Sequence, residues 1–578
     1  MTIIVLFAFA IYGNTIPNDY ALDDALVITQ NSFTHKGFSG LREIFTYDSF
    51  KGSGDTYLNS VSGGRYRPLS IATFAIEYHF FGENPHISHF LNIIFYALTC
   101  LLLFILLTKL FANHSNIHWF NTIPFIATLL FTAHPIHTEV IANIKSRDEI
   151  LSLLFSLLTL WFIIKHLETK KIIYLICSPI IFILALLSKE IATVFLIIIP
   201  ATIYFFTTQT FKKIAITLSP LIIVFCVFMF LRNSMIAKTN TDIKYVHDIM
   251  NYSFAEMNLA QKWATITYCL GLYVKLLFIP HPLTWDYYPY HIKIMEWTNV
   301  SVLISLLLYI TLIFLMIKGL KSKSVISYCI IIFDVPLSLT ANILFPVGAF
   351  MCERFVYVSS IGFAIAIAYL FAWYLNKIKI NQLLIFIPIL GLYSFKTINR
   401  NKAWKDDETL IFTDITVSTN SVRSNAEYGK ILYQRTLKIT DIEERNRIYD
   451  EVMYYETKAF EICKNVETTN FILGTLYGQY KNDLNRAIFY LENAVHLDPR
   501  HIEAYNNLGI AYGIQKNFPK AIETFENALK VSPNNIEILR NLSLTYQFIG
   551  RTDKAELYAK MIKMAEANKN FKKDSLSQ

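Results

Sequence analysis

The first candidates for chemistry are two neighbouring acids near the amino terminus. Asp23 and Asp24 follow a short apolar stretch and begin a long polar segment. Carboxylates at a boundary between membrane and water can reach both a lipid-linked substrate and a soluble acceptor. One of them could act as a general base on a hydroxyl, and its neighbour would raise its pKa usefully. A solvated loop acid or a helix cap is the alternative interpretation.

A second polar group lies between two apolar stretches. His134, His137 and Glu139 are followed by Arg147 and Glu149. Arginine can hold a phosphate with two parallel hydrogen bonds. The His-x-x-His spacing raises a zinc hypothesis, but the sequence offers no evident third ligand and no His-Glu-x-x-His motif. Ordinary histidines at the membrane interface are therefore the favoured interpretation.

Further charged residues stand at the ends of other apolar stretches. They are Arg67, Lys189, Glu190 and Arg354. Each of them alone is explained as a charged helix end at the interface, and such a charge contributes little to stability by itself. Together, on one side of one membrane, they would line a pocket of acids and cations that binds the phosphate and the substrate.

The elements that must position these residues are membrane helices. Hydrophobic residues make up 54 % of the chain and charged residues 17 %, against about 25 % charged in soluble domains. The apolar runs belong to residues 1–395, and the chain beyond Arg400 is polar with helical spacing. A span needs about 20 apolar residues, and roughly twelve segments approach that length. We therefore predict an all-α fold, a polytopic helix bundle followed by an α-solenoid.

Lysine-rich loops predict the orientation of the bundle. Four such loops, at 165–171, 212–213, 318–323 and 377–379, are expected on the cytoplasmic side. They agree with one another only if residues 264–280 form a re-entrant or interfacial segment, which leaves about eleven spans. The first loop, the polar groups above and the carboxyl-terminal domain would then be extracytoplasmic. If 264–280 crosses the membrane, that domain would be cytoplasmic.

The polar carboxyl-terminal region repeats itself every 34 residues, as tetratricopeptide (TPR) repeats do. Leu508, Gly509, Ala521 and Phe525 fit that pattern, and prolines follow the second helix of two repeats. Such arrays bind polypeptides on a concave surface, for which Asn506, Asn507 and Asn541 are our candidates. The expected domains are a membrane domain at 1–396 with a long first loop at 17–87, a junction at 397–420, repeats at 421–567 (clear at 468–501, 502–535 and 536–567) and a flexible tail at 568–578.

Composition argues against several other classes. The net charge of +8 is concentrated in the membrane region, where orientation explains it, so no nucleic-acid partner is expected. The seven cysteines form no Cys-x-x-Cys pair, which argues against a disulfide framework or a zinc knuckle. Few charges other than Asp334 fall inside apolar stretches, which disfavours an ion-coupled transporter.

These motifs resemble one family in order and along nearly the whole chain. The resemblance rests on Leu22-Asp23-Asp24, Arg67-Pro68-Leu69, the His134 to Glu149 group, Ser188-Lys189-Glu190, Glu353-Arg354 with Tyr357, Ser360 and Gly362, and Arg400-Asn401-x-Ala403-Trp404. The chain resembles the transmembrane and TPR repeat-containing family of protein O-mannosyltransferases, which have a GT-C glycosyltransferase fold. Its repeat array is shorter than those of the animal members.

The resemblance implies a membrane glycosyltransferase that moves a mannose-like hexose from a polyprenyl-phosphate donor to Ser or Thr hydroxyls of proteins, with inversion. Asp23 is the first choice for the base and Asp24 the second, and Arg147, Lys189 and Arg354 are expected to hold the lipid phosphate. No cofactor or metal is expected. An Ile-, Lys- and Asn-rich composition points to a bacterial inner membrane with periplasmic repeats, the endoplasmic reticulum with lumenal repeats being the alternative.

Two other functions stay open at this point. The chain could glycosylate a lipid or a polysaccharide, although a TPR array favours a polypeptide acceptor. It could also be a non-catalytic membrane anchor that displays the repeats as a scaffold. The collection of acids and cations described above argues against that function, because an anchor has no need of them.

Overall fold

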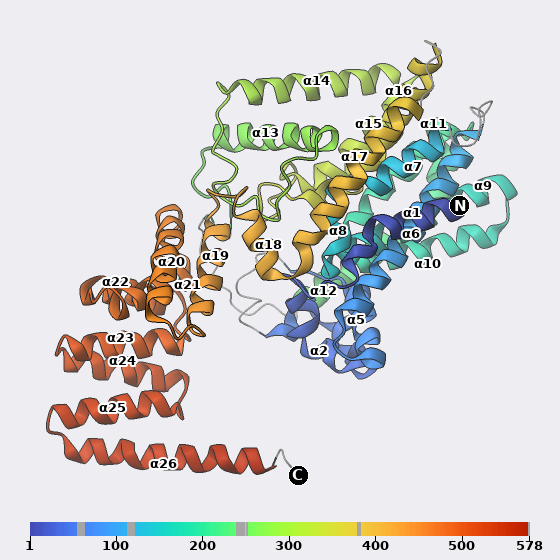
Figure 1. Cartoon of the computed structure of the whole chain (residues 1–578). Coiled ribbons are helices and arrows are strands. Elements are labelled where there is room, and N and C mark those ends of the chain that lie inside the picture. Colours follow the sequence, from blue (N-terminus) through green and yellow to red (C-terminus); the bar gives the residue numbers. More distant parts are fainter. Residues whose placement is uncertain (55–63, 113–121, 238–248, 250–251, 378–382, 576–578) are drawn as a thin grey trace. The chain divides into compact units, whose positions relative to one another are not determined.

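The computed structural model describes residues 1–54, 64–112, 122–237, 249, 252–377 and 383–575 (Figure 1). These residues form helices and connecting loops, with no strand among them. The contacts divide the chain into a first unit, Met1–Tyr287 with Ile292–Val417, and a second unit, Tyr288–His291 with Ser418–Gln578. The all-α fold class is confirmed, and the chain passes into the second unit within the expected junction.

The first unit begins with a short apolar helix and a loop region of small helices, and continues with longer apolar helices. Its helices are α1 (Thr2–Tyr12), α2 (Ser32–His35), α3 (Leu41–Thr46), α5 (Pro68–Phe81), α6 (Pro85–Leu110), α7 (Ile123–Ala133), α8 (Thr138–Ala142), α9 (Arg147–Thr169), α10 (Ile172–Ser188), α11 (Phe195–Phe206), α12 (Phe211–Ala237), α13 (Leu259–Phe278), α14 (Val300–Leu320), α15 (Val325–Thr340), α16 (Ser360–Lys377), α17 (Leu383–Asn401) and α18 (Asp407–Asp414).

Several of these helices are long and apolar enough to cross a membrane. Among the described residues four qualify: α6, α12, α14, and α9 together with the turn before it from Ile144. The bent pair of α7 and Pro135–Ala142 would make a fifth, and five further apolar helices are shorter. The protein is therefore a membrane protein by composition. The expected eleven spans and the re-entrant segment, which α13 covers as one helix, remain predictions.

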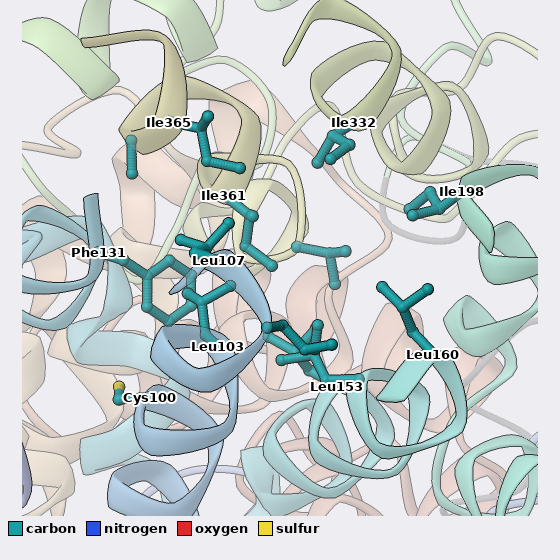
Figure 2. Close-up of a cluster of buried hydrophobic side chains, with 14 of the residues drawn as sticks. Cys100, Leu103, Leu107, Phe131, Leu153, Leu160, Ile198, Ile332, Ile361 and Ile365 are labelled. Atoms are coloured by element: carbon teal, nitrogen blue, oxygen red, sulfur yellow. The ribbon is translucent and has the colours of Figure 1, made fainter. Parts of the chain in front are cut away.

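A continuous apolar core holds the first unit together. Helix α6 packs against α1, α7 and α9, and side chains from these and later helices meet in one buried cluster. Figure 2 shows part of it, where Leu103 and Leu107 of α6 lie near Phe131 of α7 and Ile361 of α16. Dispersion contacts between closely packed side chains hold such helices together where lipid is as apolar as the helices themselves.

The segment between α7 and α9 differs from its predicted form. We expected His134 to Glu149 to be a loop facing water, but the structure buries every residue of it. Two short 3₁₀ turns, Pro135–His137 and Ile144–Ser146, flank α8 and fold the segment into the protein. Buried polar groups must be hydrogen-bonded, so its charged residues find partners inside the protein instead of water.

The second unit is a stack of helix pairs. Figure 1 shows them following one another as antiparallel helices, and each packs on the next. Their bounds are α19 (Val422–Thr436), α20 (Ile442–Ile462), α21 (Glu467–Gln479), α22 (Leu484–Leu497), α23 (Ile502–Ile514), α24 (Phe518–Val531), α25 (Ile536–Phe548) and α26 (Thr552–Ser575). This is the architecture of a TPR solenoid, as predicted.

Small residues allow the two helices of a repeat to approach closely. A Cβ atom on Gly509 of α23 would lie 2.4 Å from the ring of Phe525 in α24. Helices α22 and α24 each end two residues before a proline, Pro499 and Pro533, because proline cannot donate to the helical ladder. Helix α26 continues to Ser575, and the flexible tail from Asn568 stays a prediction. Residues 576–578 of that tail lie outside the described part of the chain.

Candidate functional site

The acid pair is held by an unusual backbone turn in the first unit. Leu22 adopts a positive φ of 51°, a left-handed conformation that non-glycine residues rarely take and that often marks functional sites. Its main-chain N–H donates to Asp407 at 2.6 Å, and that of Ala21 donates to Asp24 at 2.9 Å. The turn therefore directs Asp23 and Asp24 to different places.

Asp24 is fully buried and accepts two main-chain hydrogen bonds. Its Oδ1 accepts from the N–H of Lys145 at 2.6 Å, and its Oδ2 from Ala21. Burial raises the pKa of Asp24 to about 7, and the two hydrogen bonds oppose that rise. With both oxygens engaged, Asp24 joins the amino-terminal turn to the buried segment before α9.

Asp23 is more accessible than its neighbour. Its side chain is 31 % exposed, and its Oδ2 lies 3.6 Å from the ammonium of Lys145, whose side chain is 7 % exposed. The charges of Arg65 and Arg354 also act on it. Solvent can reach this carboxylate, as a general base that acts on a bound acceptor hydroxyl requires.

A second cluster of charges joins α5, α9 and the turn before α11. Arg67 donates to Asp148 at 2.8 Å and to Glu190 at 3.0 Å. Lys189 donates to Asp148 at 3.3 Å and to Glu149 at 2.5 Å. The structure thus brings four of the predicted site residues together, with Asp148 between the two cations. The loop before α5, the start of α9 and the end of α10 all contribute to this cluster.

Arg354 approaches the same region from the segment between α15 and α16. Its guanidinium and its main-chain N–H both donate to Glu139, the latter at 3.0 Å, and its side chain stays 24 % exposed. The thiol of Cys352 donates to the same carboxylate at 3.1 Å. Glu139 therefore orients Arg354, whose charge also acts on Asp23 and Glu149. The guanidinium of Arg354 thus stays partly accessible, which a role in binding an anion would require.

Arg147 has a different role from the one predicted. Its guanidinium is fully buried and donates to Glu77, to Asn92 at 2.6 Å, to Thr73 at 3.1 Å and to the carbonyl of Ser88 at 3.0 Å. A phosphate would have to displace these bonds inside the protein, which is costly because each buried partner would lose its donor. Arg147 fastens α9 to α5 and α6 instead.

The two histidines are also interior residues. The Nε2 of His134 lies 2.9 Å from the carbonyl of Leu277, and its Nδ1 accepts from the N–H of Ile136. His137 contacts the hydroxyls of Tyr96 at 3.1 Å and Ser360 at 2.9 Å. Both ring nitrogens of each histidine are engaged inside the protein, and their predicted role in binding substrate stays a prediction. The described residues contain no group of three or more potential metal ligands, and the prediction of a metal-free site stays a prediction.

A polar network missed by motif reasoning lies at the junction. Glu353 accepts from the N–H of Thr284 at 2.7 Å and the hydroxyl of Tyr287 at 3.0 Å, and burial raises its pKa to about 8. Arg400 pairs with Asp414 through two bonds of 2.5 and 2.7 Å. Glu353 and Arg400 carried the family resemblance. The partners of Glu353 lie 69 and 66 residues away, whereas Asp414 lies 14 residues from Arg400.

In the second unit the three predicted asparagines link successive repeats. The amide of Asn541 donates to Asn506 at 2.7 Å, and Asn506 donates to Glu537 at 2.8 Å. Asn507 donates to Thr475 of the preceding repeat at 3.0 Å. These contacts set the spacing of the repeats, and a role in holding a polypeptide remains a prediction.

Comparison with known proteins agrees with both units. The tetratricopeptide repeat family model matches residues 502–535. Protein O-mannosyl-transferase F38B6.6 of Caenorhabditis elegans is 27 % identical over 433 residues, 75 % of this chain and 60 % of that protein. Protein O-mannosyl-transferase TMTC3 of Homo sapiens is 24 % identical over 560 residues, 88 % of this chain and 58 % of that protein. The chain is a homologue of the TMTC proteins.

The resemblance stated from the motifs is thereby confirmed. The chain spans about 60 % of the length of these two relatives. A solved structure of MamA is 20 % identical, covering 31 % of this chain and 95 % of MamA with a TM-score of 0.25. The TPR protein YrrB is 15 % identical, covering 36 % of this chain and 98 % of YrrB with a TM-score of 0.24.

Proposed function

We propose that this chain is a membrane glycosyltransferase that transfers a mannose-like hexose from a polyprenyl-phosphate donor to Ser or Thr hydroxyls of proteins. The homology to proteins named O-mannosyl-transferases supports the reaction class. One structural observation carries the proposal: an accessible carboxylate, Asp23, lies beside cations on a strained turn. Its neighbour Asp24 is buried and engaged.

In the proposed reaction, Asp23 accepts the proton of the acceptor hydroxyl while the hydroxyl oxygen attacks the anomeric carbon. The new C–O bond forms as the bond from that carbon to the phosphate oxygen breaks, so the configuration inverts. The polyprenyl phosphate leaves as an anion and needs positive charge. Arg354, with a partly exposed guanidinium, is the first candidate to supply it, and Lys189 the second.

The remaining predicted residues support these groups in our proposal. Glu139 orients Arg354, while Arg67, Glu149 and Glu190 keep Lys189 and α9 in place. A sugar phosphate already contains a good leaving group, so a metal is not required. The TPR repeats would hold the polypeptide acceptor, and the site would face the periplasm of a bacterial inner membrane or, alternatively, the lumen of the endoplasmic reticulum.

The test is mass spectrometry of extracytoplasmic proteins from cells with the wild type, a deletion, and the variants Asp23→Asn, Asp24→Asn and Asp19→Asn. Removal of the general base should lower Ser/Thr hexosylation at least about 100-fold in Asp23→Asn. Asp24→Asn should lower it less and also reduce the amount of folded protein. Asp19 is exposed in the same segment, so Asp19→Asn is the matched control and should not change it.

Unchanged protein glycans in the deletion strain would overturn the proposed acceptor and turn attention to lipid-linked glycans. Loss of hexose in the deletion together with full activity of Asp23→Asn would instead overturn the assignment of the base.

A further inference from the structure

Lys145 contacts both acids of the pair, each through a different atom. Its main-chain N–H donates to Oδ1 of Asp24 at 2.6 Å, and its ammonium lies 3.6 Å from Oδ2 of Asp23. It belongs to the 3₁₀ turn Ile144–Ser146, far from both acids in sequence. One residue therefore connects the amino-terminal turn to the beginning of α9.

Burial of this ammonium is costly unless the charge is compensated. The Lys145 side chain is 7 % exposed, and a buried cation loses hydration that only close acids can replace. Asp23 and Asp148 supply negative charge, while Arg354 and Lys189 oppose it. A structural anchor at this place would need only the main-chain contact with Asp24, which any residue other than proline provides. The charged side chain thus requires a separate explanation.

We propose that Lys145 is a positioning residue of the transferase site, which holds the carboxylate of Asp23 in place and in its ionised form through its ammonium. This inference rests on the proposed function. Asp24 and the main chain of Lys145 fix the turn, and the side chain of Lys145 then directs the neighbouring base. The strained Leu22, at φ 51°, gives the turn a defined shape that the two contacts maintain.

The electrostatic surroundings of Asp23 determine the expected pH effect. Among the described residues, the cations Lys145, Arg65 and Arg354 and the acid Asp24 act on it. Removal of the Lys145 cation makes the ionised form of Asp23 less favourable, so the base takes up a proton at a higher pH. The acid limb of the pH–activity profile should then shift to higher pH.

The decisive experiment compares Lys145→Met, Lys145→Arg and the control Lys36→Met in the full chain, reconstituted in lipid nanodiscs. Lys36 belongs to the same loop region and pairs with Glu43 at 3.0 Å on the surface. The substrates are undecaprenyl-phosphate mannose and an acceptor peptide whose hexose is lost in the deletion strain. The readouts are kcat and KM between pH 5 and 9, and the thermal unfolding midpoint.

Lys145→Met keeps the main-chain contact with Asp24, so the protein should fold, although with a lower unfolding midpoint because Asp23 and Asp148 lose a cation. Its kcat should fall about 10- to 100-fold through misplacement of the base, and its acid limb should rise by about one pH unit. KM for the peptide should change little. Lys145→Arg should restore most of the acid limb, since it restores the cation, and Lys36→Met should match the wild type.

Two failures are distinguishable. If the wild type transfers sugar and Asp23→Asn does not, but Lys145→Met keeps the wild-type pH profile, the positioning role is wrong and the proposed function stands. Lys145 would also be only a structural residue if Lys145→Met lost activity without a shift of the acid limb. The same holds if Lys145→Arg failed to restore the activity that Lys145→Met loses. If the wild type transfers no sugar, the proposed function fails, and the role of Lys145 fails with it.

Discussion

The two units of this protein use polar residues in different ways. In the TPR unit, polar contacts join neighbouring repeats at a regular sequence separation, as Asn541 does with Asn506 at 35 residues. In the membrane unit they join remote segments: Arg354 and Glu139 are 215 residues apart, and Leu22 and Asp407 are 385 apart. The first pattern assembles a repetitive surface, whereas the second assembles one site.

The two units should also respond differently when a charged residue is removed. A buried charge in the membrane unit has several partners that would lose their compensation together. An exposed ion pair in the TPR unit loses only a contact that water replaces. We therefore expect stability to depend strongly on single charged residues in the first unit and on close packing in the second.

The largest expected effect is on the buried arginine of α9. Arg147→Met should destabilise the membrane unit by about 3 to 5 kcal/mol, because Glu77 and Asn92 would lose a buried cation. Denaturation in mixed micelles of a mild detergent and SDS measures this. Glu77→Gln added to Arg147→Met removes the uncompensated charge and should recover part of the loss.

The contrasting control is Arg486→Met in the TPR unit, where an exposed ion pair with Asp483 is lost. It should leave stability unchanged within error. An Arg147→Met protein as stable as the wild type, or an equal loss in Arg486→Met, would contradict the comparison between the two units.

A smaller effect is expected from close packing within a repeat. Gly509→Ala places a methyl group against the ring of Phe525, 2.4 Å away, and such overpacking costs about 1 to 3 kcal/mol. Gly513→Ala in the same helix meets nothing within 4 Å and should be neutral or stabilising, because alanine favours a helix. Urea denaturation tests both variants when unfolding of the TPR unit is followed by hydrogen exchange in its Phe- and Tyr-containing peptides. Equal stability of the two variants would refute tight packing at Gly509.

Per pH unit, the smallest expected effect is a pH dependence of the TPR unit. Glu456 is fully buried, and burial raises its pKa from 4.5 to about 8. Between these values the folded unit keeps a proton that the unfolded chain loses, so stability falls as pH rises, by about 1.4 kcal/mol per pH unit. Above the folded pKa the dependence ends.

Glu456→Gln removes this titration, so the stability of helices α19 and α20 should depend much less on pH between 6 and 8. Hydrogen exchange of peptides from these helices, corrected for the intrinsic exchange rate at each pH, measures it. A slope retained in Glu456→Gln would assign the dependence to another group.

The sequence by itself determined the TPR unit and the class of the membrane unit. Small residues such as Gly509, large ones such as Phe525 and the terminating prolines recur every 34 residues, and a local repeat must pack against its neighbour to bury its apolar face. Apolar runs likewise required helices, because no other element satisfies its own backbone in lipid. Motif order was enough to place the chain beside its TMTC relatives.

Only the tertiary structure decided how the charged residues divide their roles. Asp23 and Asp24 are indistinguishable in the sequence, and the turn at Leu22 leaves one accessible and buries the other. Arg147 and Arg354 looked equally suited to a phosphate, yet Arg147 is enclosed by Glu77 and Asn92 while Arg354 remains partly exposed. The physical reason is that burial and hydrogen bonding depend on partners from distant segments, and no local pattern encodes which partners meet.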